Sequence, residues 1–113
     1  MVPIHKKIRS LVQEEYSKAI ASGAEYLFTR KKLMPHSYDT YYKLFNEEIS
    51  VLGLDEGHKP HDPRKHFITM AKKSGVDEYA IKLIVGHAIT DITESVYTER
   101  NLEWLHKEVS KIP

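Results

Sequence analysis

The sequence predicts a single domain over residues 1–113 that is mainly α-helical with a trace of β structure. Apolar residues recur at spacings of three and four over most of the chain, as on one face of a helix. Glycines that follow these periodic segments are typical helix ends; they are Gly23, Gly53, Gly75 and Gly86. A length of 113 residues fits one domain.

The first half predicts two helices separated by a loop. Residues 2–4 are typical of a strand end that leads into a helix over residues 5–22. The apolar face of that helix comprises Ile8, Leu11, Val12, Tyr16, Ala19 and Ile20. Residues 25–29 predict a strand or a buried extended stretch, and Ser37 can cap a helix over about 38–52. The apolar stripe of this second helix comprises Tyr41, Leu44, Phe45, Ile49 and Leu52.

Shorter helices are expected in the second half. Asp62 and Pro63 open the first of them, because aspartate supplies a cap oxygen and proline fits the first turn. Asp77 caps the next helix, over residues 78–85. Residues 88–98 are expected to be irregular or weakly helical, and a last helix covers about 100–112. Its apolar stripe comprises Leu102, Leu105, Val109 and Ile112.

Composition excludes several classes of protein. The absence of cysteine excludes disulfides, thiolate metal sites and a cysteine nucleophile, and it fits a cytoplasmic location. No apolar run approaches the ~18 residues of a membrane span, and the N-terminus lacks the apolar stretch of a secretory signal. The common glycine-rich nucleotide motifs and the HExxH zinc motif are also missing.

Charge is balanced overall but unevenly distributed. The chain has 17 basic and 16 acidic residues. Residues 59–73 carry one acid, Asp62, and five bases: Lys59, Arg64, Lys65, Lys72 and Lys73. A second basic cluster comprises Arg30, Lys31 and Lys32. Local patches of this kind bear on nucleic-acid binding more than the net charge of +1 does.

The candidate chemistry lies in a spaced set of residues: His61, Arg64, Gly86-His87, Tyr97 and Arg100. His61 and Arg64 share a face at the start of a helix, where exposed N–H groups favour anions. A guanidinium fork matches two oxygens of a phosphate diester. The ordinary alternatives stay open: a solvated helix end, a glycine cap with a surface histidine, and a structural tyrosine. A metal site of His58, His61 and His66 lacks a supporting carboxylate at ligand spacing.

From His61 to Arg100 the chain resembles the tyrosine recombinase (phage integrase) family. The resemblance is carried by HDPRKHF at 61–67, SGVD at 74–77, IVGH at 84–87 and ITESVYTER at 92–100. The family shows H-x-x-R, a GVD helix junction, a GH pair and a tyrosine some nine or ten residues later. These motif sequences are most similar to those of integrases from Gram-positive phages and conjugative elements.

The resemblance implies site-specific DNA cleavage and rejoining through a 3′-phosphotyrosyl link, without a cofactor or metal. Tyr97 would be the nucleophile, His61 would assist proton transfer, and Arg64 and His87 would hold the phosphate. The partner would be double-stranded DNA at an attachment site. Further DNA contacts are expected from Lys59, Lys65, His66 and Arg100.

The family also has an arginine in a TGxRxxE-like helix and a lysine on a β-hairpin, and neither is found here. Arg9 lacks the preceding Thr-Gly and has Val12 where the acid should be. The resemblance therefore implies an integrase catalytic core truncated at its N-terminal side, inactive alone. Two other readings stay open: a non-catalytic DNA-binding remnant and a helical interaction module. The last helix, within residues 101–113, could pack on its own domain or dock on a second protomer.

Overall fold

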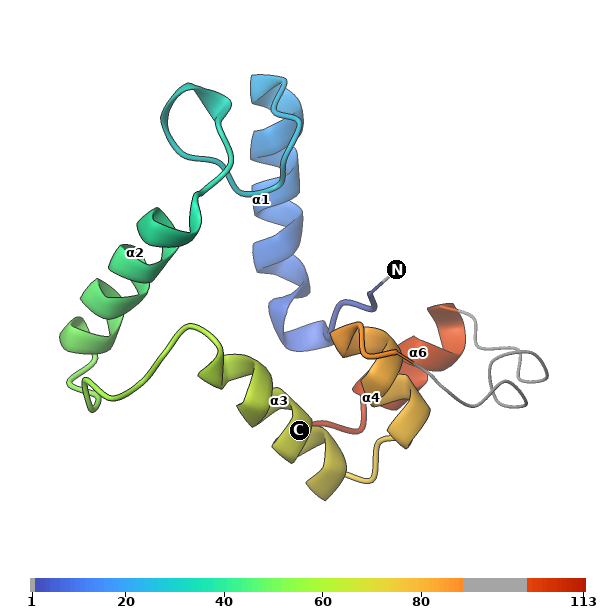
Figure 1. Cartoon of the computed structure of the whole chain (residues 1–113). Helices are drawn as coiled ribbons and strands as arrows, with labels where there is room; N and C mark the ends of the chain where they lie inside the picture. Colours follow the sequence, from blue (N-terminus) through green and yellow to red (C-terminus); the bar gives the residue numbers. More distant parts are fainter. Residues whose placement is uncertain (1, 89–101) are drawn as a thin grey trace. The chain divides into compact units, whose positions relative to one another are not determined.

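The computed structural model describes residues 2–88 and 102–113, and the described part is mainly helical (Figure 1). Its elements are η1 (Lys6–Ile8), α1 (Arg9–Ser22), η2 (Lys31–Leu33), α2 (Tyr38–Val51), α3 (Asp62–Lys73), α4 (Glu78–Val85) and α6 (Leu102–Val109). The trace of β structure is an antiparallel bridge between Thr29 and Pro35. The predicted fold class is therefore confirmed. None of the described helices is long and apolar enough to span a bilayer.

Contacts divide the chain into two compact units. Unit 1 comprises Met1–Arg9 and Arg64–Pro113, and unit 2 comprises Ser10–Pro63. A single domain over the whole chain stays a prediction. The two units differ sharply in how their apolar side chains are packed.

Unit 1 has a small core built by α3, α4 and α6. Its buried cluster comprises Ala71, Val76, Ala80, Ile81 and Leu105, with Phe67, Ile68, Leu83, Ile84, Trp104 and Ile112 packed around it. Ala71 of α3 and Ala80 of α4 are completely buried in this cluster, and α6 contacts α4. Leu105 and Val109 of the predicted stripe are buried here, so α6 packs on its own unit.

Local sequence sets the two ends of α4. The Asp77 carboxylate accepts hydrogen bonds from the backbone N–H groups of Tyr79 (2.9 Å) and Ala80 (3.2 Å). Gly86 ends the helix in the left-handed conformation, with φ of 71°, which costs glycine little. Both predictions for α4 are confirmed. The last helix ends at Val109, before the predicted 112. Its predicted start near residue 100 lies outside the described residues, as does almost all of the expected segment 88–98.

A buried carboxylate fastens the C-terminus to the start of α4. Glu108 accepts hydrogen bonds from the Asp77 backbone N–H (2.8 Å) and from Lys111 Nζ (2.7 Å). Lys111 Nζ also lies 3.3 Å from the Gly75 carbonyl oxygen, and His5 Nε2 lies 3.0 Å from the Ile112 carbonyl oxygen. Burial raises the pKa of Glu108, but hydrogen bonds from Lys111 and Asp77 outweigh it, so the pKa is lowered overall.

Unit 2 has no buried side chain among residues 10–63. The expectation that α1 and α2 each bury an apolar face is wrong for most of the predicted residues. The exposed members include Leu11, Tyr16 and Ile20 of α1, Tyr41 and Leu44 of α2, and Leu52 directly after α2. The other apolar members, such as Val12 and Phe45, are half-buried, so neither helix has a buried face.

Two further expectations in the first half need correction. Residues 25–29 are not buried, because Tyr26, Leu27 and Phe28 face solvent in a series of bends. Residues 2–5 form no strand, and the first helix begins as η1 before α1 starts at Arg9. Ser37 is confirmed as the cap of α2, since its hydroxyl accepts a hydrogen bond from the Thr40 N–H at 3.3 Å.

Stability should depend on the core of unit 1 and not on the apolar residues of unit 2. Leu105→Ala removes a side chain that is 3% exposed and should cost about 2–5 kcal/mol of unfolding free energy. Val51→Ala, at a residue 81% exposed, should change it by less than about 0.5 kcal/mol. Urea denaturation followed by circular dichroism measures both, and equal losses would contradict the assigned core.

The hydrogen bonds that the Glu108 carboxylate accepts should make the stability of the fold depend on pH. The pKa of Glu108 is lowered in the folded state, so its stabilisation is full above the ordinary value of 4.5 and is lost as pH falls through the folded value. Glu108→Gln should therefore lower the unfolding free energy at neutral pH and flatten its decline below pH 4.5. Glu103→Gln, on the exposed side of α6, is the matched control. Identical pH profiles for the two variants would refute a stabilising role of the Glu108 carboxylate.

Candidate functional site

Arg64 joins the beginning of one helix to the end of another. It lies in the first turn of α3, half-buried, and its Nη2 donates a hydrogen bond to the carbonyl oxygen of Val85, the last residue of α4. Both residues of this contact belong to unit 1. The guanidinium is therefore held at the C-terminal end of α4, one residue before Gly86.

His87 leaves α4 at the same end. Its backbone N–H donates to the Lys82 carbonyl at 2.9 Å, and the Gly86 N–H donates to the Leu83 carbonyl at 3.3 Å. These bonds close the helix and fix the backbone from which the exposed imidazole projects. The Arg64 guanidinium thus contacts the backbone of Val85, which is two residues before His87 in the chain.

The chemistry open to this pair follows from its donors. A guanidinium carries five N–H donors, and the Val85 carbonyl engages only the Nη2 end. The other N–H groups can still donate to phosphate oxygens, and a histidine ring adds one donor when neutral and two when protonated. The end of α4 can therefore present fixed cationic and neutral donors to one anion.

His61 lies in the turn directly before α3 and is exposed. The turn is held by Asp62, whose Oδ2 accepts a hydrogen bond from the Lys59 N–H at 2.8 Å and lies 3.8 Å from His58 Nδ1. Asp62 was expected to precede α3 as its cap, but it is the first residue of the helix. His61 belongs to unit 2, so its approach to Arg64 and His87 stays a prediction.

The other predicted site residues differ in what the structure says of them. Lys59, Lys65 and His66 are exposed, as DNA-contacting residues must be. Tyr97 and Arg100 lie outside the described residues. Within the described ranges, no three histidine, aspartate or glutamate side chains gather at metal-binding distances.

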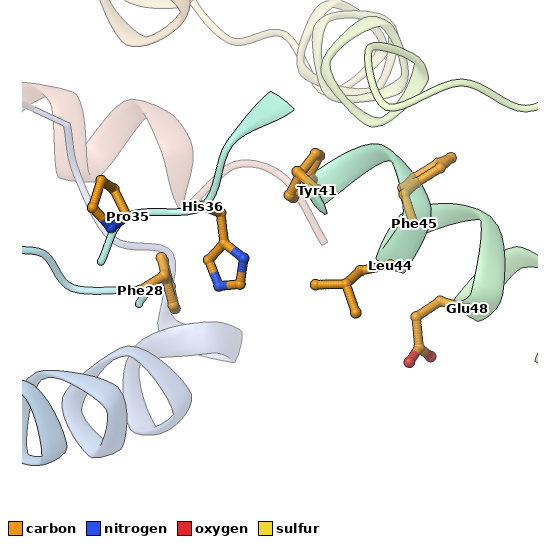
Figure 2. A pocket seen from close by; sticks show the side chains of 7 residues that line it. All are labelled: Phe28, Pro35, His36, Tyr41, Leu44, Phe45 and Glu48. Carbon is orange, nitrogen blue, oxygen red and sulfur yellow. The ribbon is translucent and has the colours of Figure 1, made fainter. Parts of the chain in front are cut away.

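A hollow of about 560 Å³ lies in unit 2, and none of the predicted site residues lines it. Figure 2 shows the ring of His36 and the side chain of Leu44 facing one another across it. The lining comprises Phe28, Pro35, His36, Tyr41, Leu44, Phe45 and Glu48. His36 Nδ1 is buried and has no hydrogen-bond partner in the described structure. The hollow is part of the uncovered apolar side of α2, and sequence periodicity alone could not reveal it.

A sequence model of the phage integrase family matches residues 1–103, a range that contains His61, Arg64, His87 and Tyr97. No curated protein and no solved structure gave a significant match. Because the family model covers most of the chain, the protein belongs to the phage integrase family of tyrosine recombinases.

Proposed function

We propose that this chain supplies the nucleophile and the main phosphate-binding groups for DNA strand cleavage and rejoining in site-specific recombination. The observation that carries the proposal is the hydrogen bond from Arg64 to the Val85 carbonyl, which holds the guanidinium beside Gly86 and His87. The family match supports recombination in general. The roles of single residues are the proposal.

The reaction begins with the Tyr97 phenol oxygen attacking a backbone phosphorus of duplex DNA. A P–O bond to tyrosine forms, the bond to the 5′-oxygen breaks, and a 3′-phosphotyrosyl link remains. A tyrosine has an unperturbed pKa of about 10, so little phenolate is present at neutral pH. His61 assists removal of the phenol proton, and the departing 5′-oxygen takes up a proton to become a hydroxyl. A second 5′-hydroxyl then reverses these steps.

Arg64 and His87 act on the phosphate. Negative charge grows on the nonbridging oxygens as tyrosine attacks, and donors already in place stabilise it without reorganisation. Loss of one such donor typically costs about 10²–10³-fold in rate. The phosphotyrosyl link conserves the bond energy, so the exchange needs no nucleotide or metal. Lys59, Lys65, His66 and Arg100 hold the flanking DNA.

Two finer points belong to the same proposal. The chain corresponds to the C-terminal part of a catalytic domain of Gram-positive phage or conjugative-element type, and it acts in the cytoplasm. Self-association through residues 101–113 must use what unit 1 leaves exposed, because Leu105 and Val109 are buried within it. Leu102, which is 38% exposed, is the main apolar side chain of that stripe left for a second protomer.

A covalent trapping assay tests the proposal. Residues 1–113 are joined to the upstream half of a related recombinase, which supplies the second arginine and the hairpin lysine. The hybrid meets a nicked duplex carrying that recombinase's attachment site, so the cleaved fragment diffuses away and the adduct accumulates. We expect an adduct on denaturing gels that Tyr97→Phe abolishes and that Arg64→Gln slows at least about 100-fold. Tyr16→Phe, at an exposed tyrosine of α1, should keep it.

Residues 1–113 alone should give no adduct, because they lack the family's upstream catalytic arginine and hairpin lysine. DNA binding by the hybrid without an adduct would select the non-catalytic remnant instead. An adduct that survives Tyr97→Phe would refute the assigned nucleophile, and an adduct from the 113 residues alone would refute their inactivity.

A further inference from the structure

A tight basic loop in unit 2 takes no part in the chemistry proposed above. The bridge between Thr29 and Pro35 closes it, and the Arg30 N–H donates to the Met34 carbonyl at 2.8 Å. Between these ends, η2 (Lys31–Leu33) turns the chain in three residues. The loop therefore presents Arg30, Lys31 and Lys32 from a backbone that is held at both ends.

The backbone of this loop is costly to adopt. Lys32 has φ of 60° and Leu33 has φ of 56°, in the left-handed region that residues with a side chain seldom adopt. Glycine would make such a turn more cheaply. Strain of this kind at a fixed turn points to a role for the side chains that it displays.

The charges of the loop are not neutralised nearby. No acid occurs between residues 26 and 38, and the three bases are exposed. None of them takes part in the ion pairs of the described residues, whereas Lys18 of the same unit pairs with Glu14 at 2.7 Å and Glu15 at 2.8 Å. The three bases and Met34 line a hollow of about 400 Å³, which is roomy enough for a phosphate group.

We propose that Arg30, Lys31 and Lys32 bind the phosphate backbone of double-stranded DNA. This inference rests on the proposed function, which makes duplex DNA the partner. Three adjacent cations can neutralise successive phosphates and release their counterions. An anionic membrane surface is the other chemistry that a basic loop can serve, but membrane-binding clusters typically hold about four to eight bases. The loop has three, which favours DNA.

The test compares two double variants of the full chain that lose the same charge. Lys31→Gln with Lys32→Gln removes two of the three positive charges of the loop. Lys18→Gln with Lys43→Gln removes two lysines that each have acidic residues one helical turn away. Binding to a fluorescent duplex of arbitrary sequence is measured by anisotropy at several salt concentrations. Each lost phosphate contact should reduce the slope of log affinity against log salt by about one. The loop variant should therefore lose about two and the control almost nothing.

Circular dichroism checks that both variants keep their helices. Equal slopes for the loop variant, the control and the parent chain would overturn the inference, and adduct formation by the hybrid would then leave the proposed function standing. A parent chain that binds no duplex would also overturn the inference, and adduct formation by the hybrid would still decide the proposed function. Loss of binding to phosphatidylserine vesicles with unchanged DNA binding would overturn the inference and assign the loop to a membrane.

Discussion

The hydrogen bond from the Arg64 guanidinium to the Val85 carbonyl is the constraint on which the site depends. It joins residues 21 positions apart and places a permanent cation at the end of α4. Ala71 of α3 and Ala80 of α4 belong to one buried cluster, which holds both helices in the same core. Gly86 then turns the chain, and His87 follows at the same end.

The rest of unit 1 keeps this end of α4 in place. Asp77 caps the opposite end of the helix, and Glu108 accepts the Asp77 N–H while Lys111 neutralises the buried carboxylate. Through Glu108, α6 is bound to the N-terminal end of α4, and Arg64 contacts the C-terminal end of α4. A helix fixed at both ends presents its C-terminal groups with less freedom, and preorganised donors are what a developing phosphate charge requires.

Features set by short-range chemistry were predictable from the sequence. Ser37, Asp77 and Gly86 act as caps where the pattern placed them, because a cap needs only neighbouring backbone groups. The position of Arg64 in the first turn of α3 was also clear. Its partner was not, because a contact between Arg64 and a backbone carbonyl 21 residues away depends on tertiary packing.

The burial of apolar residues in unit 2 was the feature that the sequence predicted least well. The spacing of Leu11 and Tyr16, or of Tyr41 and Leu44, indicates an apolar helix face, but it says nothing of what covers that face. The positive φ angles of Lys32 and Leu33 were hidden for a related reason, since neither residue signals a left-handed turn. Tyr97 was assigned by its place in the family motif, and its role is still a proposal.

The central claim is that Arg64 and His87 bind one phosphate at the end of α4. A crystal structure of the recombinase hybrid bound to nicked attachment-site DNA tests this claim most directly. The account predicts the scissile phosphate within hydrogen-bond distance of both the Arg64 guanidinium and the His87 imidazole, with Arg64 still contacting the Val85 carbonyl. A scissile phosphate that contacts neither side chain, with DNA bound elsewhere on the protein, would contradict it.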